Sequence, residues 1–224
     1  MPSIITMVCL ADSRKNLAHC VAGKIVAEEY KGQWVRPISA VDKCELSNRD
    51  ICYSNGQMPR LLDVISIAVK EHASKNHQQE NWIIDKTVPW KKVGELPIDQ
   101  LPDLCDNTQT IWVNDHDSTF GLNDKVPTAI AHKKITSSLL LIQPENVTYK
   151  VGIEHKNKKK VRAYFKFKGQ DYAIAVTDYT AEQYYLTKKL GIYDGNKMPL
   201  FYCVSLAEDY YDYCFKLIAG IIQY

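Results

Sequence analysis

The sequence predicts a mainly β protein with a few short helices, and three observations in its second half support this fold class. Three neighbouring segments have an apolar residue at every second position, which is the period of strands with one buried face. These segments are 147–153, 161–167 and 172–176. A capping-box pattern at Thr180 and Gln183, with Gly191 beyond it, predicts a helix of roughly 10 residues. Two further apolar segments, 200–206 and 213–222, follow the helix.

This succession of three strands, a helix and two strands is the order of an OB-fold. An OB-fold is a small five-stranded barrel that commonly binds oligonucleotides or oligosaccharides. We therefore expect residues 136–224 to form a C-terminal OB-fold domain, with the helix at about 181–190 between the third and fourth strands. Residues 1–135 would form an N-terminal domain, for which the strand order is less obvious.

The first half contains shorter apolar segments bounded by turn residues. We predict strands at 3–11, 33–36, 61–69, 81–85 and 111–113. Pro37 would stop the second of these strands. Residues 23–30 fit either a strand or a short helix, and residues 97–104 fit a helical turn that prolines keep short. The polar stretches between the strands are expected to be loops, including one directly after the first strand, at 12–19.

The bulk composition restricts the class of protein but not its partner. A hydrophobic fraction of 46% with 24% charged residues is ordinary for a soluble globular protein. The sequence has neither an apolar run of about 18 residues nor a signal-peptide core, so we expect a cytoplasmic protein without a membrane partner. The formal net charge of +2 neither demands nor excludes nucleic acid, so any electrostatic argument depends on local patches.

The cysteines favour a reducing compartment. They are odd in number and widely spaced, and several lie in apolar segments, where cysteine behaves as a small hydrophobic residue. Their positions are Cys9, Cys20, Cys44, Cys52, Cys105, Cys203 and Cys214. Because no CxxC pair occurs, we predict reduced cysteines, no disulfide, no structural metal and no cofactor.

Several stretches distributed along the chain resemble the bacterial dual OB-fold domain family. They are 9–15, 20–24, 34–37, 80–85, 172–178, 204–209 and 214–219. The resemblance covers nearly the whole chain and implies two OB-like small β-barrels in tandem, which extends the barrel order of the second half to the first. It carries over no catalytic residues. A role in nucleic-acid processing or bacterial defence would be an association only, because fold does not determine function.

A basic stripe in the second half is the leading candidate for a binding site. It lies at alternating positions of segment 161–167, opposite the apolar side, on the face that OB-folds use for ligands. The stripe comprises Arg162, Tyr164, Lys166 and Lys168, and Lys160 ends the lysine run before it. We expect these cations to face solvent, so that replacing them would leave folding nearly intact. Alternatively, the stripe is the ordinary solvent face of an antiparallel sheet, whose lysines guard an exposed edge.

Two further groups of candidates lie near the N-terminus. Arg14, Lys15 and Lys24 could hold phosphates from the loop after the first strand, or that loop could simply be solvated. Trp34 and Arg36 lie two residues apart and share one side of their strand, as a base-stacking platform with a phosphate contact requires. In the competing interpretation Trp34 belongs to the core and Arg36 extends from beneath it.

Catalysis and metal binding have weaker support. A nucleophile among Cys9, Ser13 and Cys20 with His19 as its base would be an enzyme site, but nearness in sequence is poor evidence for such geometry. The group His77, Glu80 and Asn81 is better explained by a polar loop than by a metal site, because it lacks the usual ligand spacing.

The preferred hypothesis is a non-catalytic module that binds single-stranded or structured nucleic acid, with DNA or RNA left open. Basic residues would contact phosphates and exposed rings would stack on bases. The alternative is a protein-interaction module of a larger assembly, and an enzyme is the third hypothesis. Tyrosines are dense in 179–224, which suits either stacking or a protein interface.

Overall fold

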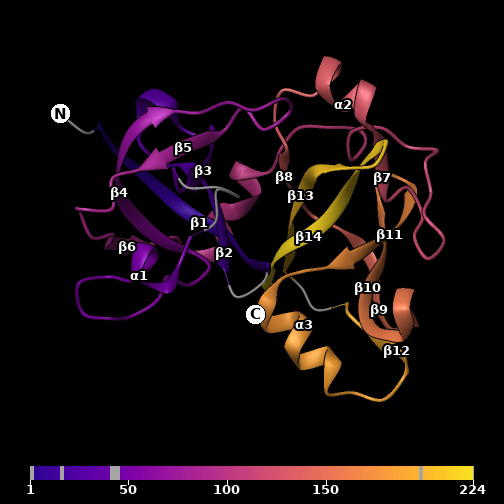
Figure 1. Ribbon diagram of the computed structural model, residues 1–224. Helices are drawn as coiled ribbons and strands as arrows, with labels where there is room; N and C mark the ends of the chain where they lie inside the picture. Colours follow the sequence, from indigo (N-terminus) through magenta and orange to yellow (C-terminus); the bar gives the residue numbers. More distant parts are fainter. Residues whose placement is uncertain (1–2, 16–17, 41–45, 197–198, 224) are drawn as a thin grey trace. The chain divides into compact units, whose positions relative to one another are not determined.

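The computed structural model describes residues 3–15, 18–40, 46–196 and 199–223, except for the side chain of Lys15. The chain divides into two compact units, Met1–Leu104 and Cys105–Tyr224 (Figure 1). This division lies about 30 residues before the boundary expected near 135, because residues after Leu104 already bond within the second unit. The backbone N–H of Leu141 donates to the Asp106 carboxylate at 2.7 Å.

The first unit is a barrel whose strands close on themselves. Its strands are β1 (Ser3–Lys15), β2 (Ala18–Ile25), β3 (Trp34–Ile38), β4 (Asp63–His72), β5 (Asn81–Ile84) and β6 (Lys91–Glu95). They pair in the circuit β1-β2-β3-β5-β4, and β4 returns to β1. The pairing of β3 with β5 is parallel and the others are antiparallel. β6 extends the sheet from β4.

Short helices connect the strands of this unit, and alternating side chains fill its core. The helices are η1 (Glu28–Tyr30), α1 (Asn48–Ile51) and η2 (Ile98–Leu104). Met7 and Cys9 of β1 and Ile65 and Ile67 of β4 share one core cluster, as alternate positions that face the barrel interior do, and the outward-facing side of β1 is also buried at Val8. The sequence-based expectation of strands here is therefore confirmed for four of the five segments, and 111–113 is irregular instead.

Two local expectations for this unit are wrong, those for the loop at 12–19 and for Pro37, and the segment left open between strand and helix contains both. Residues 12–15 continue β1, and β2 begins at Ala18, so the expected loop at 12–19 is largely a hairpin. The ambiguous segment 23–30 divides between β2 and η1. Pro37 lies inside β3 because β2 pairs with β3 only at Trp34 and Val35, so no ladder bond to β2 is lost at Pro37.

The second unit has the predicted OB-fold order. Its strands are β7 (Lys125–Pro127), β8 (Leu139–Ile142), β9 (Glu145–Glu154), β10 (Lys158–Phe167), β11 (Gln170–Val176), β12 (Gly191–Asp194), β13 (Leu200–Tyr210) and β14 (Tyr213–Gln223). β8 and β9 are the two parts of one bent first strand, interrupted at Pro144. β8 pairs with β13 and β9 with β10, so the two parts of this first strand lie at opposite ends of the order β9-β10-β11-β14-β13-β8. As in the first unit, the third and fifth strands, β11 and β14, pair in parallel.

Helices of the second unit are α2 (Thr128–Lys134), η3 (His155–Asn157) and α3 (Tyr179–Leu186). The predicted helix between the third and fourth barrel strands is therefore confirmed, but it begins and ends earlier than expected. Asp178, not Thr180, caps it by accepting a hydrogen bond from the Ala181 backbone N–H at 2.8 Å. No helix in the described part of the chain has the length and apolar character needed to cross a membrane.

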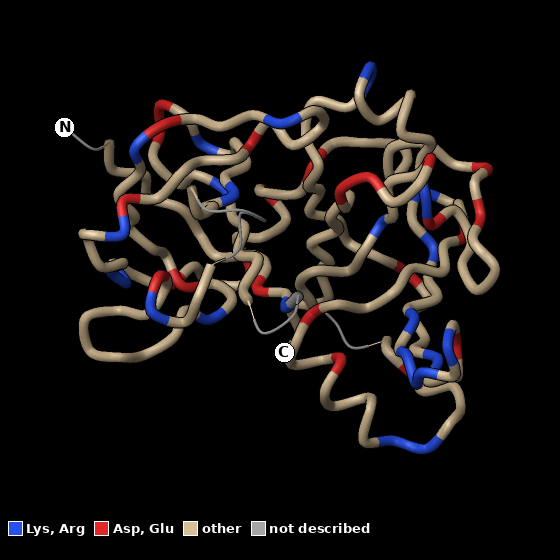
Figure 2. Tube along the Cα trace, viewed as in Figure 1, with Lys and Arg blue, Asp and Glu red and all other residues tan. Residues whose placement is uncertain are grey.

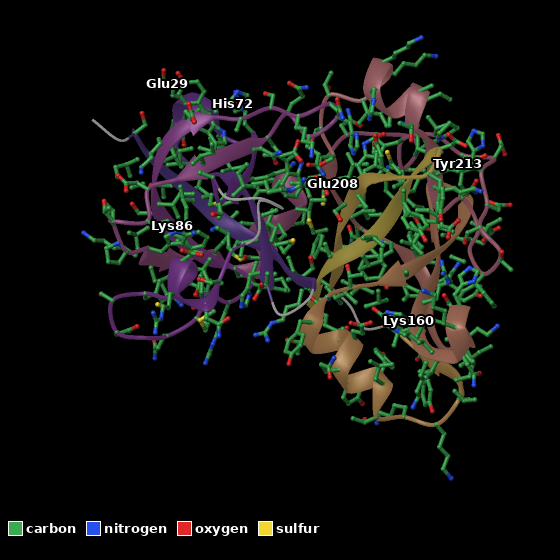
Figure 3. The ribbon with its side chains drawn as sticks, in the orientation of Figure 1. Glu29, His72, Lys86, Lys160, Glu208 and Tyr213 are labelled. Carbon is green, nitrogen blue, oxygen red and sulfur yellow. The ribbon has the colours of Figure 1, made fainter. Side chains whose placement is uncertain are left out.

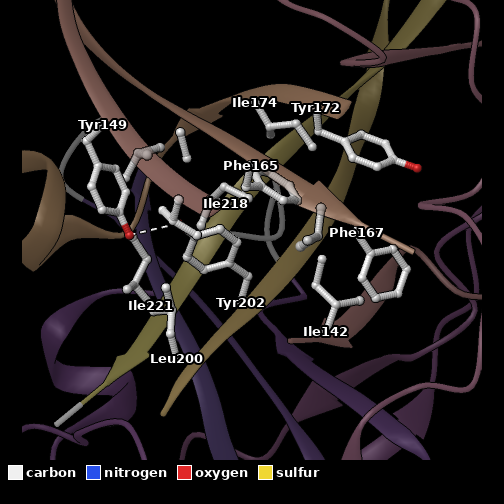
Figure 4. Packing of buried hydrophobic residues seen from close by; sticks show 14 of the residues in the cluster. Ile142, Tyr149, Phe165, Phe167, Tyr172, Ile174, Leu200, Tyr202, Ile218 and Ile221 are labelled. Carbon is white, nitrogen blue, oxygen red and sulfur yellow. Dashed lines mark hydrogen bonds between the residues drawn. The ribbon is translucent and has the colours of Figure 1, made fainter. Parts of the chain in front are cut away.

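Aromatic side chains fill the core of the second barrel (Figure 4). The Tyr202 hydroxyl donates to that of Tyr149 at 2.8 Å, so these buried polar groups are paired. Phe165 stacks on Tyr172 and meets Tyr202 edge-on, with ring centroids 5.4 and 5.3 Å apart. Burial raises the pKa of Tyr202 well above its usual value. The opposite face of these strands is the one on which OB-folds commonly bind ligands.

Candidate nucleic-acid interface

Arg162 lies on the outer face of β10 but is buried, with 7% of its surface exposed. Its Nε and Nη2 donate to the two Glu154 carboxylate oxygens at 3.1 and 3.0 Å. Its Nη1 donates to Asp124 Oδ2 and to the Ala173 carbonyl, both at 3.0 Å. The expectation that Arg162 faces solvent is wrong, and its charge is compensated within the barrel.

The cover over Arg162 is the segment 113–124, which precedes β7. Leu122 forms a β-bridge with Ala173 of β11, and Asn123 Nδ2 donates to the Asp171 carbonyl at 3.0 Å. Two residues before Leu122, the Phe120 ring meets His155 edge-on, with ring centroids 5.1 Å apart. OB-folds commonly bind ligands on the second and third strands, which are β10 and β11 here. Part of that face is therefore occupied by an acidic segment of the chain itself.

The rest of the predicted stripe remains accessible. Tyr164 is half-buried, and Lys166 forms a surface ion pair with Asp171 at 2.8 Å. Lys168 is exposed and has a φ of 49°, which places it with Gly169 in the β10–β11 turn rather than in the strand. These three side chains stay candidates for contacts with nucleic acid.

The connection between β9 and β10, together with the start of β10, carries the densest group of cations on this barrel (Figure 2). The connection is η3, which holds Lys156, and β10 begins with Lys158, Lys159 and Lys160; Lys156, Lys158 and Lys160 are exposed. Lys160, labelled in Figure 3, lies 3.5 Å from Glu182 of α3. We call Lys156, Lys158 and Lys160 the lysine loop. The lysine run is evident in the sequence, but the sequence-based prediction of binding residues includes only Lys160 from it.

Lys159 differs from its neighbours because it is tied to the end of α3. Its Nζ donates to the Leu186 carbonyl at 2.7 Å and also to the Lys188 carbonyl. The last carbonyls of a helix have no partner within the helix, so a lysine there stabilises the C-terminus. Lys159 thus fixes α3 against β10, and the lysines on either side of it project outward.

The cations proposed on the first barrel are mostly engaged internally. Lys24 is 3% exposed, its Nζ donates to the Leu104 carbonyl at 2.7 Å, and it lies 5.0 Å from the centroid of the half-buried Trp34 ring. Arg36 forms an ion pair with the buried Glu80 at 3.1 Å. The expectation that Lys24 is available to phosphates is therefore wrong, and the half-buried Arg36 is paired with a carboxylate.

The remaining N-terminal candidates are less informative. Arg14 is partly buried in β1, and the Lys15 side chain lies outside the described residues. His19 is buried, with Nδ1 2.6 Å from Asp12 Oδ1 and Nε2 2.8 Å from Asn48 Oδ1. Because both ring nitrogens are engaged by these partners, the arrangement does not favour His19 as the base of a nucleophile.

The polar residues His77, Glu80 and Asn81 are buried rather than exposed in a loop. Glu80 is the partner of Arg36, which explains its burial without a metal. No disulfide joins the cysteines of the described ranges, and Cys44 lies outside them.

Two features of the second barrel were missed from the sequence. Lys216 of β14 is buried, and its Nζ donates to the Val113 carbonyl at 2.7 Å. Burial lowers the pKa of Lys216 to about 7, although Asp124 and Asp117 oppose the shift. This lysine occupies the position of a core residue in an apolar strand, and its partner is more than 100 residues away in sequence, so no local pattern identifies it.

The second missed feature is a pair of tyrosines at the β13–β14 turn. Tyr210 and Tyr211 are 63% and 85% exposed, and their rings meet edge-on at 4.8 Å. Nearby, at the start of β14, the Lys125 Nζ lies 3.8 Å from the centroid of the Tyr213 ring (Figure 3). In OB-folds the turn between the fourth and fifth strands is one of the loops that contact ligands. The density of tyrosines was visible in the sequence, but the exposure of these two was not.

Comparison with known proteins identifies a family for this chain. The family model of the dual OB-containing domain matches residues 5–221, which is nearly the whole chain. No match was found among curated proteins or among solved structures. The closed circuit of β1–β5 and the second sheet, in the order β9-β10-β11-β14-β13-β8, are consistent with the two OB-folds that this family description names. The chain belongs to the dual OB-containing domain family.

Proposed function

We propose that the chain is a non-catalytic OB-fold module that binds single-stranded or structured nucleic acid through the lysine loop of its second barrel. The observation that carries the proposal is the exposure of Lys156 on the connection between the first and second barrel strands, and of Lys158 and Lys160 at the adjoining start of β10. That connection is one of the two loops that OB-folds commonly use for oligonucleotides. Phosphate groups are the partners that such a cluster of ammonium groups favours.

The accessible part of β10 extends this site. Tyr164 is half-buried on the outer face, and Lys166 shares that face two residues later. A ring beside cations suits stacking on a base next to a phosphate contact, which is the usual arrangement for binding single strands without reading their sequence. Arg162 is excluded from this role, because Glu154 and Asp124 already hold its guanidinium.

The proposal predicts binding that weakens steeply with salt. Fluorescence anisotropy with labelled single- and double-stranded DNA and RNA, at two salt concentrations, measures both the preference and the slope. Each phosphate contact to a single strand contributes about 0.7 to the slope of log affinity against log salt. Replacing Lys156, Lys158 and Lys160 together with glutamine should flatten the slope by roughly 2.

The matched control removes the same charge elsewhere. Lys91, Lys133 and Lys134 are also exposed, so their triple replacement with glutamine changes the net charge equally without touching the lysine loop. The control should keep the wild-type slope. The proposal is wrong if the wild-type protein binds no nucleic acid at low salt, or if the two triple variants lose binding equally.

A second variant separates stacking from charge. Replacing Tyr164 with alanine should cost about 1–3 kcal/mol of binding free energy, while the salt slope stays nearly unchanged. A flattened slope in this variant would contradict the assignment of Tyr164 to stacking.

A further inference from the structure

β12 is an edge strand whose outer side is not paired within the described chain. It lies at the end of the strand order of its sheet and pairs antiparallel with β9 (Figure 1). An edge strand presents a row of backbone donors and acceptors that a further strand can use. The groups that point outward can be identified from the register.

Ile192 and Asp194 supply these outward groups. The backbone N–H of Gly195 donates to the Val147 carbonyl at 2.9 Å, which marks a hydrogen-bonded pair at the end of the ladder. In an antiparallel ladder such pairs alternate with non-bonded pairs. The next bonded pair is therefore Tyr193 with Tyr149, while Ile192 faces Lys150 in a non-bonded pair. The N–H and C=O of Ile192 consequently point away from β9.

The side chains around this edge are mainly apolar and basic, with Asp194 of β12 as an exposed carboxylate among them. Ile192 is 71% exposed and Leu190 is 59% exposed. Tyr184 of α3 is also exposed, and the Lys188 Nζ lies 4.4 Å from its ring centroid. Lys189 is exposed beside them, and Lys150 stands opposite Ile192 on β9. We call Tyr184, Lys188, Lys189, Leu190 and Ile192 the α3–β12 surface.

The edge strand of the first barrel shows what a protected edge looks like. β6 carries Lys91, Lys92 and Glu95, and its pairing with β4 is interrupted by a register shift. Charges and bulges of this kind prevent unwanted strand pairing. β12 instead presents Ile192 at its centre and has no register shift against β9.

We propose that β12 is a docking edge for an extended acidic segment of a partner protein, which would add a strand to the second barrel. Backbone hydrogen bonds to Ile192 and Asp194 would provide affinity, as in other cases of strand addition. Apolar side chains at alternate positions of the segment would pack on Ile192 and Leu190. Its carboxylates would lie near Lys150, Lys188 and Lys189, and this complementarity of charge selects an acidic partner.

The test uses a fluorescein-labelled peptide of alternating glutamate and valine, with a peptide of alternating lysine and valine as its counterpart. The full chain should bind the acidic peptide and not the basic one. Ile192→Pro removes the outward N–H and keeps the ladder bonds of Gly191 and Tyr193. It should lower the affinity for the acidic peptide by about tenfold. The matched control is Val93→Pro on β6, which should bind as the wild type does.

A second variant keeps the proposal testable if Ile192→Pro does not fold, which a thermal melt would reveal. Reversing charge with Lys188→Glu and Lys189→Glu should abolish binding of the acidic peptide and create binding of the basic one. Failure of the wild type to bind the acidic peptide, or binding that survives both sets of substitutions, overturns the proposal.

The oligonucleotide measurement distinguishes this surface from the lysine loop. Ile192→Pro should leave oligonucleotide affinity and its salt slope unchanged, because Lys156, Lys158 and Lys160 lie on η3 and β10, with which β12 does not pair. If Ile192→Pro instead lowers the affinity for the oligonucleotide and leaves the affinity for the peptide unchanged, the α3–β12 surface belongs to the nucleic-acid interface. The proposal of a docking edge is then refuted.

Discussion

The two barrels share one strand order but compensate the cation on their second strand differently. Lys24 of β2 donates to the Leu104 carbonyl, which is neutral, whereas Arg162 of β10 is held by the carboxylates of Glu154 and Asp124. In each barrel, part of the partner set comes from a segment flanking the barrel strands. An outward position on a strand is therefore not the same as a solvent-facing position, because the flanking chain can cover it.

The difference in partners sets the expected cost of losing each cation. Removing one member of a buried ion pair leaves uncompensated charge, while removing a donor to a carbonyl leaves one unsatisfied acceptor. The second barrel should therefore depend more strongly on its second-strand cation than the first.

Arg162→Gln should have the largest effect. It leaves Asp124 and Glu154 buried or half-buried without their cation, and such losses typically cost about 3–5 kcal/mol of unfolding free energy. Urea denaturation would measure the change. A loss below about 0.5 kcal/mol, the usual range for surface substitutions, would show that Arg162 behaves as the solvent-facing residue the strand pattern predicts.

Because of Lys216 in the second barrel, the free energy of unfolding should rise with pH. Its pKa is about 7 in the folded chain and 10.5 ordinarily, so between these values the unfolded chain binds the extra proton. The burial penalty is fully present below pH 7 and disappears as the pH rises towards 10.5. Relative to Lys216→Met, the wild type should gain roughly 2–3 kcal/mol between about pH 7 and 9.

Comparing the two proteins removes the contributions of cysteines and tyrosines, which titrate in both. Denaturation curves at several pH values would supply the two profiles. Parallel profiles for wild type and Lys216→Met would contradict the shifted pKa, and a wild-type profile that falls relative to the variant would contradict its sign.

Lys24→Met should cost less than Arg162→Gln. The methionine fills much of the lysine volume, but the Leu104 carbonyl loses a donor, which is worth about 1–3 kcal/mol. Denaturation of both variants under one set of conditions ranks them directly. If Lys24→Met proved the more damaging, the contrast between a neutral and a charged partner would not explain the two barrels.

The smallest effect is expected at the surface pair of Lys166 and Asp171. Lys166→Gln should change the unfolding free energy by at most about 1 kcal/mol, because exposed ion pairs contribute little. The same variant should weaken oligonucleotide binding in low salt. Unchanged binding would remove Lys166 from the interface, and a large loss of stability would show that this part of β10 is not a solvated face.

Much of the second barrel could be predicted from local sequence patterns. The alternation in β9, β10 and β11 reflects one inner face, and the order of strands and helix then identified the fold. The start of α3 was misplaced because Thr180 and Gln183 mimic a capping box within the first turn, while Asp178 forms the cap. β6 was missed because all of its residues are exposed, so it has no apolar period.

The candidate site was harder to predict because covering segments are non-local. The partner Asp124 lies 38 residues before Arg162, and Leu104 lies 80 residues after Lys24. The unit boundary after Leu104 was missed for a related reason, since no glycine- or serine-rich linker marks it. By contrast, the lysine loop is a local feature, and local features are what sequence patterns report.

The most direct test of the difference between the barrels is an NMR titration of the isotope-labelled chain with a short single-stranded oligonucleotide at low salt. The proposed function predicts perturbed backbone signals at 155–160 and around Tyr164, with little change at Lys24, Trp34 and Arg36, whose side chains are engaged in the first barrel. Perturbations confined to the first barrel, with signals of the lysine loop unmoved, would contradict it.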